Sequence, residues 1–223
     1  MLILGFLPYI NQAVAQEDIL PPLRKSVTLF GGAALPTGEF AAASGKDAGF
    51  AKTGFVLGVE NSAEAVRHFL VGLEVNASSM PIDAATAQSA YIDKLGTNNL
   101  TVDAGSWLIV GVLGDVGFGA NLGSSVYLYG KGKLGLAFGN TPQISLQVNN
   151  EPVTQNSASA SAFAFGFGFG VIANNAFDIG VHFLSLTPEY RVTTIQGGTS
   201  TVSNFSQPTS VFQLRVGYSI SLN

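Results

Sequence analysis

The sequence predicts an all-β fold, an eight-stranded antiparallel up-and-down β-barrel that spans a membrane. Three observations lead to this fold class. Many segments alternate apolar with small or polar residues, and only 11% of the 223 residues are charged, against about 25% in soluble domains. Long and short connections also alternate between the predicted strands. An even strand number with this alternation is typical of a transmembrane barrel.

The clearest alternation is AFAFGFGFGV, residues 162–171. Its phenylalanines, Phe163, Phe165, Phe167 and Phe169, are separated only by Ala or Gly. A strand points successive side chains to opposite faces, so these four rings share one face. A helix is disfavoured because each of the three glycines would cost about 1 kcal/mol relative to Ala. We therefore predict a strand whose phenylalanines face lipid.

The last segment of the chain has the same period over residues 212–222. Its outward set is predicted to be Phe212, Leu214, Val216 and Tyr218, with Arg215 on the inward face. The Phe-rich segment, this last segment and six weaker ones give eight predicted strands, at residues 26–35, 51–61, 66–78, 103–114, 124–139, 160–174, 176–187 and 209–222. SWLIVGVLG, residues 106–114, is apolar at both odd and even positions. Alternation therefore does not show which of its residues face the lumen.

The connections between these strands differ in length. Four are long and rich in Ser, Thr, Asn, Ala and Gly, at residues 36–50, 79–102, 140–159 and 188–208. The other three, at residues 62–65, 115–123 and 175, are shorter. Both chain ends fall on the side of the short connections. We expect four long loops at one end of the barrel.

The N-terminal residues 1–15 are predicted to be a signal peptide, followed by a barrel domain over residues 16–223. A short apolar run, LILGFLPYI, precedes Ala13-Val14-Ala15, which has the form of a signal-peptidase site. The run is too short for a transmembrane helix, which needs about 20 apolar residues. No Lys or Arg precedes it, which leaves open a truncated or misplaced start.

Polar residues on the inward faces predict a charge network in the lumen. Alternation places the following side chains there: Glu60, Glu74, Lys131, Lys133, Asp178, His182 and Arg215. It also places His68 inward. Three acids and three bases would balance, and charges in a narrow, low-dielectric interior must pair. Because side chains fill an eight-stranded barrel, we favour a plug over an ion path.

No catalytic, cofactor or metal site is expected. His182 and Asp178 lie four residues apart on one face, and with Ser219 or Ser221 they could assemble a nucleophile and its base. A filled lumen offers a substrate no cleft, so these groups are interpreted as lumen packing. The G-x-G-x-x-G match at residues 130–135 continues as strand rather than opening a helix. With no Cys and two His, no complete zinc ligand set is apparent.

Four stretches carry a family resemblance: GGAALPTGEF (31–40), KTGFVLGVE (52–60), VYLYGKGKLGLAFG (126–139) and LRVGYSISLN (214–223). With them the chain resembles the small outer-membrane β-barrel family, the OmpA- and OmpX-like eight-stranded proteins of Gram-negative bacteria. The resemblance implies insertion by the barrel-assembly machinery, periplasmic termini and long loops on the cell surface. Members usually end in an aromatic residue, whereas here Leu222 and Asn223 end the chain.

The expected function is that of a non-enzymatic surface protein of the bacterial outer membrane, structural or adhesive, acting through its long extracellular loops. Its expected partners are outer-membrane lipid, the assembly machinery and a host-surface or extracellular ligand. The net charge of −4 argues against nucleic acid. The alternative function is a narrow pore or a lumenal binder of a small molecule or lipid. An alternative fold, a soluble lipocalin-like barrel, would require charged outer faces that these strands lack.

Overall fold

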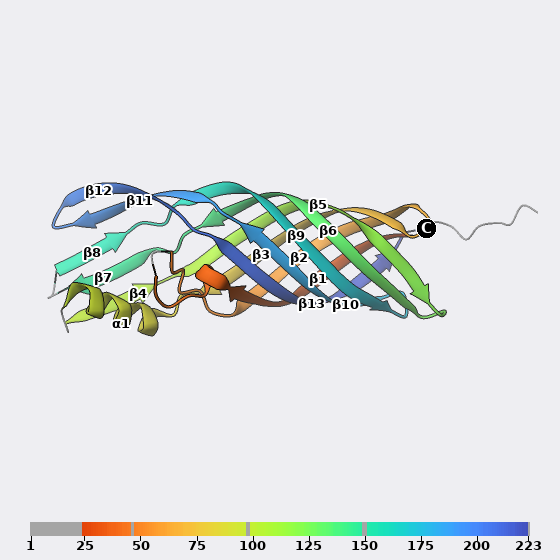
Figure 1. Ribbon diagram of the computed structural model, residues 1–223, viewed down its shortest axis with the longest axis horizontal. Helices are drawn as coiled ribbons and strands as arrows, with labels where there is room; N and C mark the ends of the chain where they lie inside the picture. Colours follow the sequence, from red (N-terminus) through yellow and green to blue (C-terminus); the bar gives the residue numbers. More distant parts are fainter. Residues whose placement is uncertain (1–23, 46, 97–98, 149–150, 223) are drawn as a thin grey trace, which may run out of the picture.

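The computed structural model describes residues 24–45, 47–96, 99–148 and 151–222 (Figure 1). The predicted signal peptide, residues 1–15, lies outside the described residues, as does the start of the predicted barrel domain. In the part that the structure describes, no helix is long and apolar enough to cross a membrane.

Eight long strands form a closed antiparallel barrel. They are β1 (Lys25–Thr37), β2 (Gly54–Val66), β3 (Phe69–Pro81), β5 (Ser106–Leu122), β6 (Val126–Asn140), β9 (Ser159–Ala173), β10 (Phe177–Leu186) and β13 (Thr209–Ser221). Their order around the barrel is β1-β13-β10-β9-β6-β5-β3-β2, and β1 also pairs with β2. Every strand therefore has two neighbours, which satisfies the backbone without a free edge. The predicted fold class and all eight strands are confirmed.

The two ends of the barrel differ, as Figure 1 shows. Three tight turns join β2 to β3, β5 to β6 and β9 to β10 at one end, where β1 begins and β13 ends. We call this the turn end. The four long connections lie at the opposite end, which we call the loop end. The expected alternation of long and short connections is confirmed.

Strand β5 is longer than predicted. Residues 115–122, predicted to be part of a connection, continue the strand, and the turn is confined to residues 123–125. The segment DVGFGANL was misread because Asp, Asn and Gly are typical of turns. Its glycines instead make room in the lumen, since a Cβ at Gly119 would collide with the Tyr127 ring.

The inward prediction for His68 is wrong. His68 is exposed in the turn between β2 and β3, where it has a positive φ of 70°. Its ring Nδ1 lies 2.9 Å from the carbonyl oxygen of Gly119. The two-residue alternation was extended one residue too far, because Val66 pairs with Phe69 across a two-residue turn.

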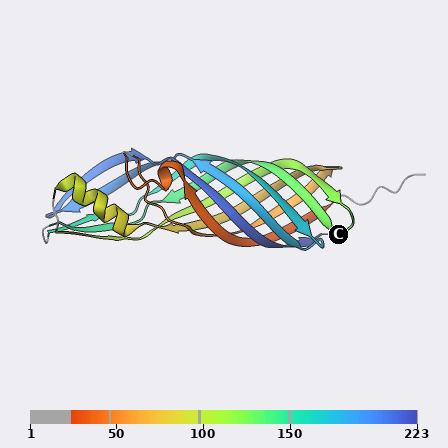
Figure 2. The same cartoon turned by 60° about the horizontal axis from the view of Figure 1, so that its bottom comes forward.

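The long connections are themselves folded. They form a five-stranded sheet in the order β12-β11-β8-β7-β4, which we call the loop sheet (Figure 1). Its strands are β4 (Leu100–Ala104), β7 (Ile144–Val148), β8 (Glu151–Gln155), β11 (Glu189–Gln196) and β12 (Thr199–Ser206). Helix α1 (Ala84–Leu95) lies beside β4, and a short 3-10 helix, η1 (Gly38–Phe40), follows β1 (Figure 2). The loop end thus continues beyond the closed barrel as a second, hydrogen-bonded sheet.

Candidate functional site

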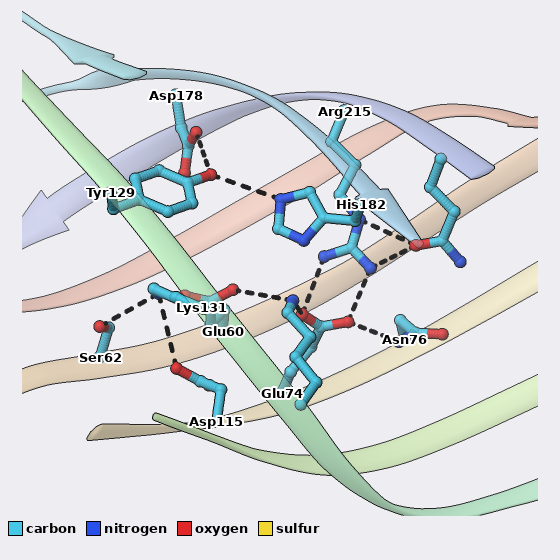
Figure 3. A network of polar contacts seen from close by, with 12 residues as sticks. Glu60, Ser62, Glu74, Asn76, Asp115, Tyr129, Lys131, Asp178, His182 and Arg215 are labelled. Carbon is cyan, nitrogen blue, oxygen red and sulfur yellow. Dashed lines mark hydrogen bonds and ion pairs between the residues drawn. The ribbon is translucent and has the colours of Figure 1, made fainter. Parts of the chain in front are cut away.

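The lumen is centred on Glu74, which is fully buried (0% exposed) on β3. Its two carboxylate oxygens accept hydrogen bonds of 2.8 and 2.7 Å from the two terminal nitrogens of Arg215 on β13 (Figure 3). Lys133 forms an ion pair with the same carboxylate, and the Asn76 amide donates to it. A carboxylate that holds two cations and an amide is a fully engaged buried ion.

Arg215 is held in place from its other sides. Its Nε donates to the Gln213 side-chain oxygen at 3.0 Å, and Gln213 donates onward to Ser78 at 3.2 Å. The guanidinium carbon lies 4.1 Å from the centre of the Phe30 ring, a cation–π distance. The bidentate pair is therefore locked in one geometry.

A second group surrounds Lys131 on β6. Its ammonium forms an ion pair with Glu60 and donates to the Ser62 hydroxyl at 3.2 Å. Lys133 lies 3.6 Å from the second Glu60 oxygen, which joins this group to the Glu74 group. The predicted residues Glu60, Glu74, Lys131, Lys133 and Arg215 therefore lie in one continuous network of β2, β3, β6 and β13.

Asp115 is a network residue that was not among the predicted lumen charges. It lies inside β5, 3.7 Å from the Lys131 ammonium, and its side chain is fully buried. Within the described part of the chain, neither of its carboxylate oxygens has a hydrogen-bond partner. Counting Asp115, the inward charges named in the sequence become four carboxylates against three cations rather than the balanced three and three. Continued alternation through residues 115–122 was the signal that could have found it.

Asp178 and His182 belong to a separate contact with Tyr129. The Tyr129 hydroxyl donates to Asp178 at 2.8 Å and lies 3.4 Å from His182 Nε2 (Figure 3). The Ser219 hydroxyl is buried without a hydrogen bond among the described residues, so it is not paired with His182. Instead, the glycine face of β9 accommodates these rings, because a Cβ at Gly168 would collide with His182 and one at Gly170 with Tyr129.

The loop-end half of the lumen is apolar. Phe40, Met80, Trp107, Leu184 and Tyr190 are buried in a single hydrophobic cluster that continues from the barrel into the loop sheet. Trp107 packs edge-on against Phe40 and donates its indole N–H to the Gly49 carbonyl at 3.0 Å. The undetermined facing of residues 106–114 is thus resolved, with Trp107, Ile109 and Leu113 inward.

Little free space remains beside the charges. Two cavities of about 10 Å³ each lie near Glu60, Tyr129 and Asp178, and each is large enough for about one water molecule. In the described residues, no three His, Cys, Asp or Glu side chains are grouped to hold a metal ion. The charged side chains of the lumen are therefore packed against one another with little space between them.

The outer surface of the barrel is apolar. The eight side chains predicted to face lipid are between 36% and 62% exposed: Phe163, Phe165, Phe167, Phe169, Phe212, Leu214, Val216 and Tyr218. The Phe167, Phe183 and Phe212 rings form a chain across β9, β10 and β13, with centroid separations of 5.2 and 5.0 Å. In the eight strands as described, Lys25 at the turn end is the one charged residue at an outward position.

No protein-family model matches the sequence, and no curated protein is similar to it. Among solved structures, the chain is similar to a major outer membrane protein from Thermus thermophilus, with 12% identity and a TM-score of 0.53 over 89% of this chain and 99% of that one. Neisserial surface protein A matches 88% of this chain and 96% of its own with 11% identity and a TM-score of 0.48. The Ail protein of Yersinia pestis matches 88% and 99% with 16% identity and a TM-score of 0.47.

At such low identity, the likeness to the Thermus protein concerns the fold alone. That fold agrees with the closed barrel described above and with the resemblance seen in the sequence. The chain has the fold of the small eight-stranded outer-membrane β-barrel proteins.

Proposed function

We propose that the protein is a non-enzymatic surface protein of the bacterial outer membrane that binds an extracellular partner through its loop sheet. The apolar outer surface supports the membrane location, because uncharged outward faces suit lipid and would leave a soluble barrel poorly solvated. The tight turns, the start of β1 and the end of β13 then face the periplasm, and the loop sheet extends outside the cell.

The filled lumen favours a role outside the barrel over a role inside it. A pore or a lumenal binding site needs continuous or enclosed space, whereas the interior holds an ion-pair network, an apolar cluster and cavities of about 10 Å³. These cavities give the alternative functions, a narrow pore or a lumenal binder, little support.

The proposed binding rests on the free edge of the loop sheet. Strand β12 ends the sheet, and every residue in it except Phe205 is exposed. Its sequence, TSTVSNFS, has no charged residue and no Pro. Charged residues and Pro normally protect an edge strand from pairing with another strand. The opposite edge, β4, has α1 beside it. An unprotected edge can accept an extended peptide strand through backbone hydrogen bonds.

The geometry of the β11–β12 hairpin indicates which backbone groups are free. Gly197 and Gly198 both have positive φ, 54° and 78°, as in a type I′ turn. Gln196 and Thr199 flank this turn and form a hydrogen-bonded pair, so alternate residues of β12 point their N–H groups away from β11. Val202 is one of these outward-pointing residues.

The net negative charge of the loop end favours some kinds of extracellular partner over others. The connections at residues 38–53, 82–105, 141–158 and 187–208 hold seven Asp or Glu and four Lys or Arg, a formal charge of −3. This charge disfavours polyanions such as sulfated glycans or nucleic acid. A protein segment that is neutral or basic fits better.

Adhesion of expressing bacteria to epithelial monolayers and to matrix-protein coats tests the proposal. Val202→Pro removes an edge N–H without breaking the β11–β12 pairing, whereas the control Val202→Thr keeps that N–H. We expect the wild type and Val202→Thr to adhere above vector-only cells, and Val202→Pro to lose the gain while still folding. No gain in the wild type on any surface, or full adhesion by Val202→Pro, would contradict the proposal.

A further inference from the structure

A groove lies at the loop end between α1 and the connection that follows β1. Its volume is about 650 Å³, within the range of about 300–1,000 Å³ that small-molecule sites occupy. It lies apart from both the lumen network and the β12 edge, and none of the functions considered above uses it. Figure 2 shows α1 on the outside of the loop end.

One wall of the groove is a single face of α1. Thr86, Ser89, Ala90 and Asp93 are spaced three and four residues apart and therefore lie on the same side of the helix. The helix is fixed at its start, where the Asp83 carboxylate accepts a hydrogen bond from the Thr86 backbone N–H at 3.2 Å. That bond holds the pKa of Asp83 below its usual value. This wall is thus preformed.

The opposite wall is built around Phe50. This residue has a φ of 51°, a left-handed conformation that is uncommon for a bulky side chain. Its N–H donates to the Ala42 carbonyl at 3.2 Å, and its carbonyl accepts from the Asp83 N–H at 2.8 Å. The second bond ties this wall to the start of α1. A strained aromatic residue held from both sides and facing a groove is a feature of functional sites.

The lining combines two aromatic rings with hydroxyl groups and balanced charge. Phe50 and Tyr91 supply the rings, small alanines and a glycine leave the space open, and Thr86 and Ser89 supply hydroxyls. Asp93 and Lys94 are the one carboxylate and the one amine in the described lining. Burial raises the pKa of the Tyr91 phenol, so it remains an uncharged hydroxyl at physiological pH.

We propose that this groove binds a neutral saccharide. A sugar ring presents apolar C–H faces, which suit Phe50 and Tyr91, and hydroxyl groups, which suit Thr86, Ser89 and Asp93. The described lining carries one carboxylate and one amine, a formal charge of zero, which favours a neutral ligand over an ionic one. A purely apolar ligand would leave the hydroxyls and the carboxylate without hydrogen-bond partners. The inference rests on the proposed function in placing the groove outside the cell. Binding itself is measurable on the purified protein.

Trp107 provides an internal reporter for binding. It is the one tryptophan in the chain, and its indole is hydrogen-bonded to the carbonyl of Gly49, the residue before Phe50. The full chain in detergent micelles is titrated with maltotriose, lactose and chitobiose, with a sulfated disaccharide as the ionic comparison. Tryptophan emission and saturation-transfer NMR follow the binding. Ala90→Leu fills the groove from α1, and Ala85→Leu is the matched control on an exposed part of the same helix.

We expect at least one neutral sugar to bind saturably, with affinity lowered about tenfold or more by Ala90→Leu and unchanged by Ala85→Leu. Heat-dependent gel migration verifies that both variants are folded. Three results would overturn the inference: no neutral sugar binds, Ala90→Leu binds as the wild type does, or the sulfated disaccharide binds better. Because no cells are involved, this failure is distinct from a failure of the adhesion test.

Discussion

Glu74 and Arg215 face each other across the lumen from strands that are not neighbours. Glu74 lies on β3 and Arg215 on β13, and β1 and β2 separate these strands in the barrel order. Two hydrogen bonds of 2.8 and 2.7 Å nonetheless join the side chains. The pair therefore crosslinks the barrel through its interior.

Removing the carboxylate should destabilise the barrel strongly. Glu74→Gln leaves Arg215 and Lys133 without their common partner, and breaking a buried ion pair in this way costs about 3–5 kcal/mol. Urea unfolding of the protein in lipid vesicles, followed by gel migration, measures the change. Glu39→Gln, an exposed carboxylate at the loop end, is the control and should have little effect. Equal stability of Glu74→Gln and the wild type would show that the crosslink contributes nothing.

Asp115 should behave in the opposite way to Glu74. Its carboxylate has no hydrogen bond among the described residues, and Lys131 already pairs with Glu60. Asp115→Asn removes a buried negative charge that accepts no hydrogen bond from the described residues, at nearly constant volume, so we expect stability equal to or above that of the wild type in the same unfolding assay. A loss as large as that of Glu74→Gln would mean that Asp115 is an essential partner of Lys131.

Substitutions of Phe167 test whether the outer surface of the barrel contacts lipid. Phe167→Arg places a charge on the exposed face of β9, which costs about 2–4 kcal/mol if that position lies at the bilayer midplane. Phe167→Leu keeps an apolar side chain and should be mild. Refolding yield and the free energy of unfolding in vesicles give the comparison. If both variants had the same stability, this face of β9 would not be in contact with lipid.

How far the sequence predicts the molecule depends on how different the two faces of each strand are. In β9 one face is Phe and the other Ala or Gly, so the strand was identified and the structure agrees. In β5 both faces are apolar near Trp107, so alternation could not reveal that the loop-end half of the lumen is hydrophobic. In the same strand, Asp115 was not predicted to face the lumen, because the run of Gly, Asp and Asn around it has the composition of a turn.

Long-range pairing and the loop end depended on information that local patterns do not contain. Alternation placed Glu74 inward but could not choose among Lys131, Lys133 and Arg215, since the choice depends on strand register and side-chain reach. The loop sheet was expected only as long loops, because its strands are about five to eight residues long and rich in Ser and Thr. Their pairing becomes favourable once the barrel brings them together.

The proposed function requires a sealed barrel, because only then is the loop end the part of the protein that acts. Recording from planar lipid bilayers tests this claim most directly, with the purified wild-type protein and Glu74→Ala compared under the same conditions. We expect no steady conductance from the wild type, because an ion-pair network fills one half of the lumen and an apolar cluster fills the other. We expect a rise in conductance or a loss of stability in Glu74→Ala. Steady single-channel currents from the wild type, unchanged in Glu74→Ala, would contradict this claim.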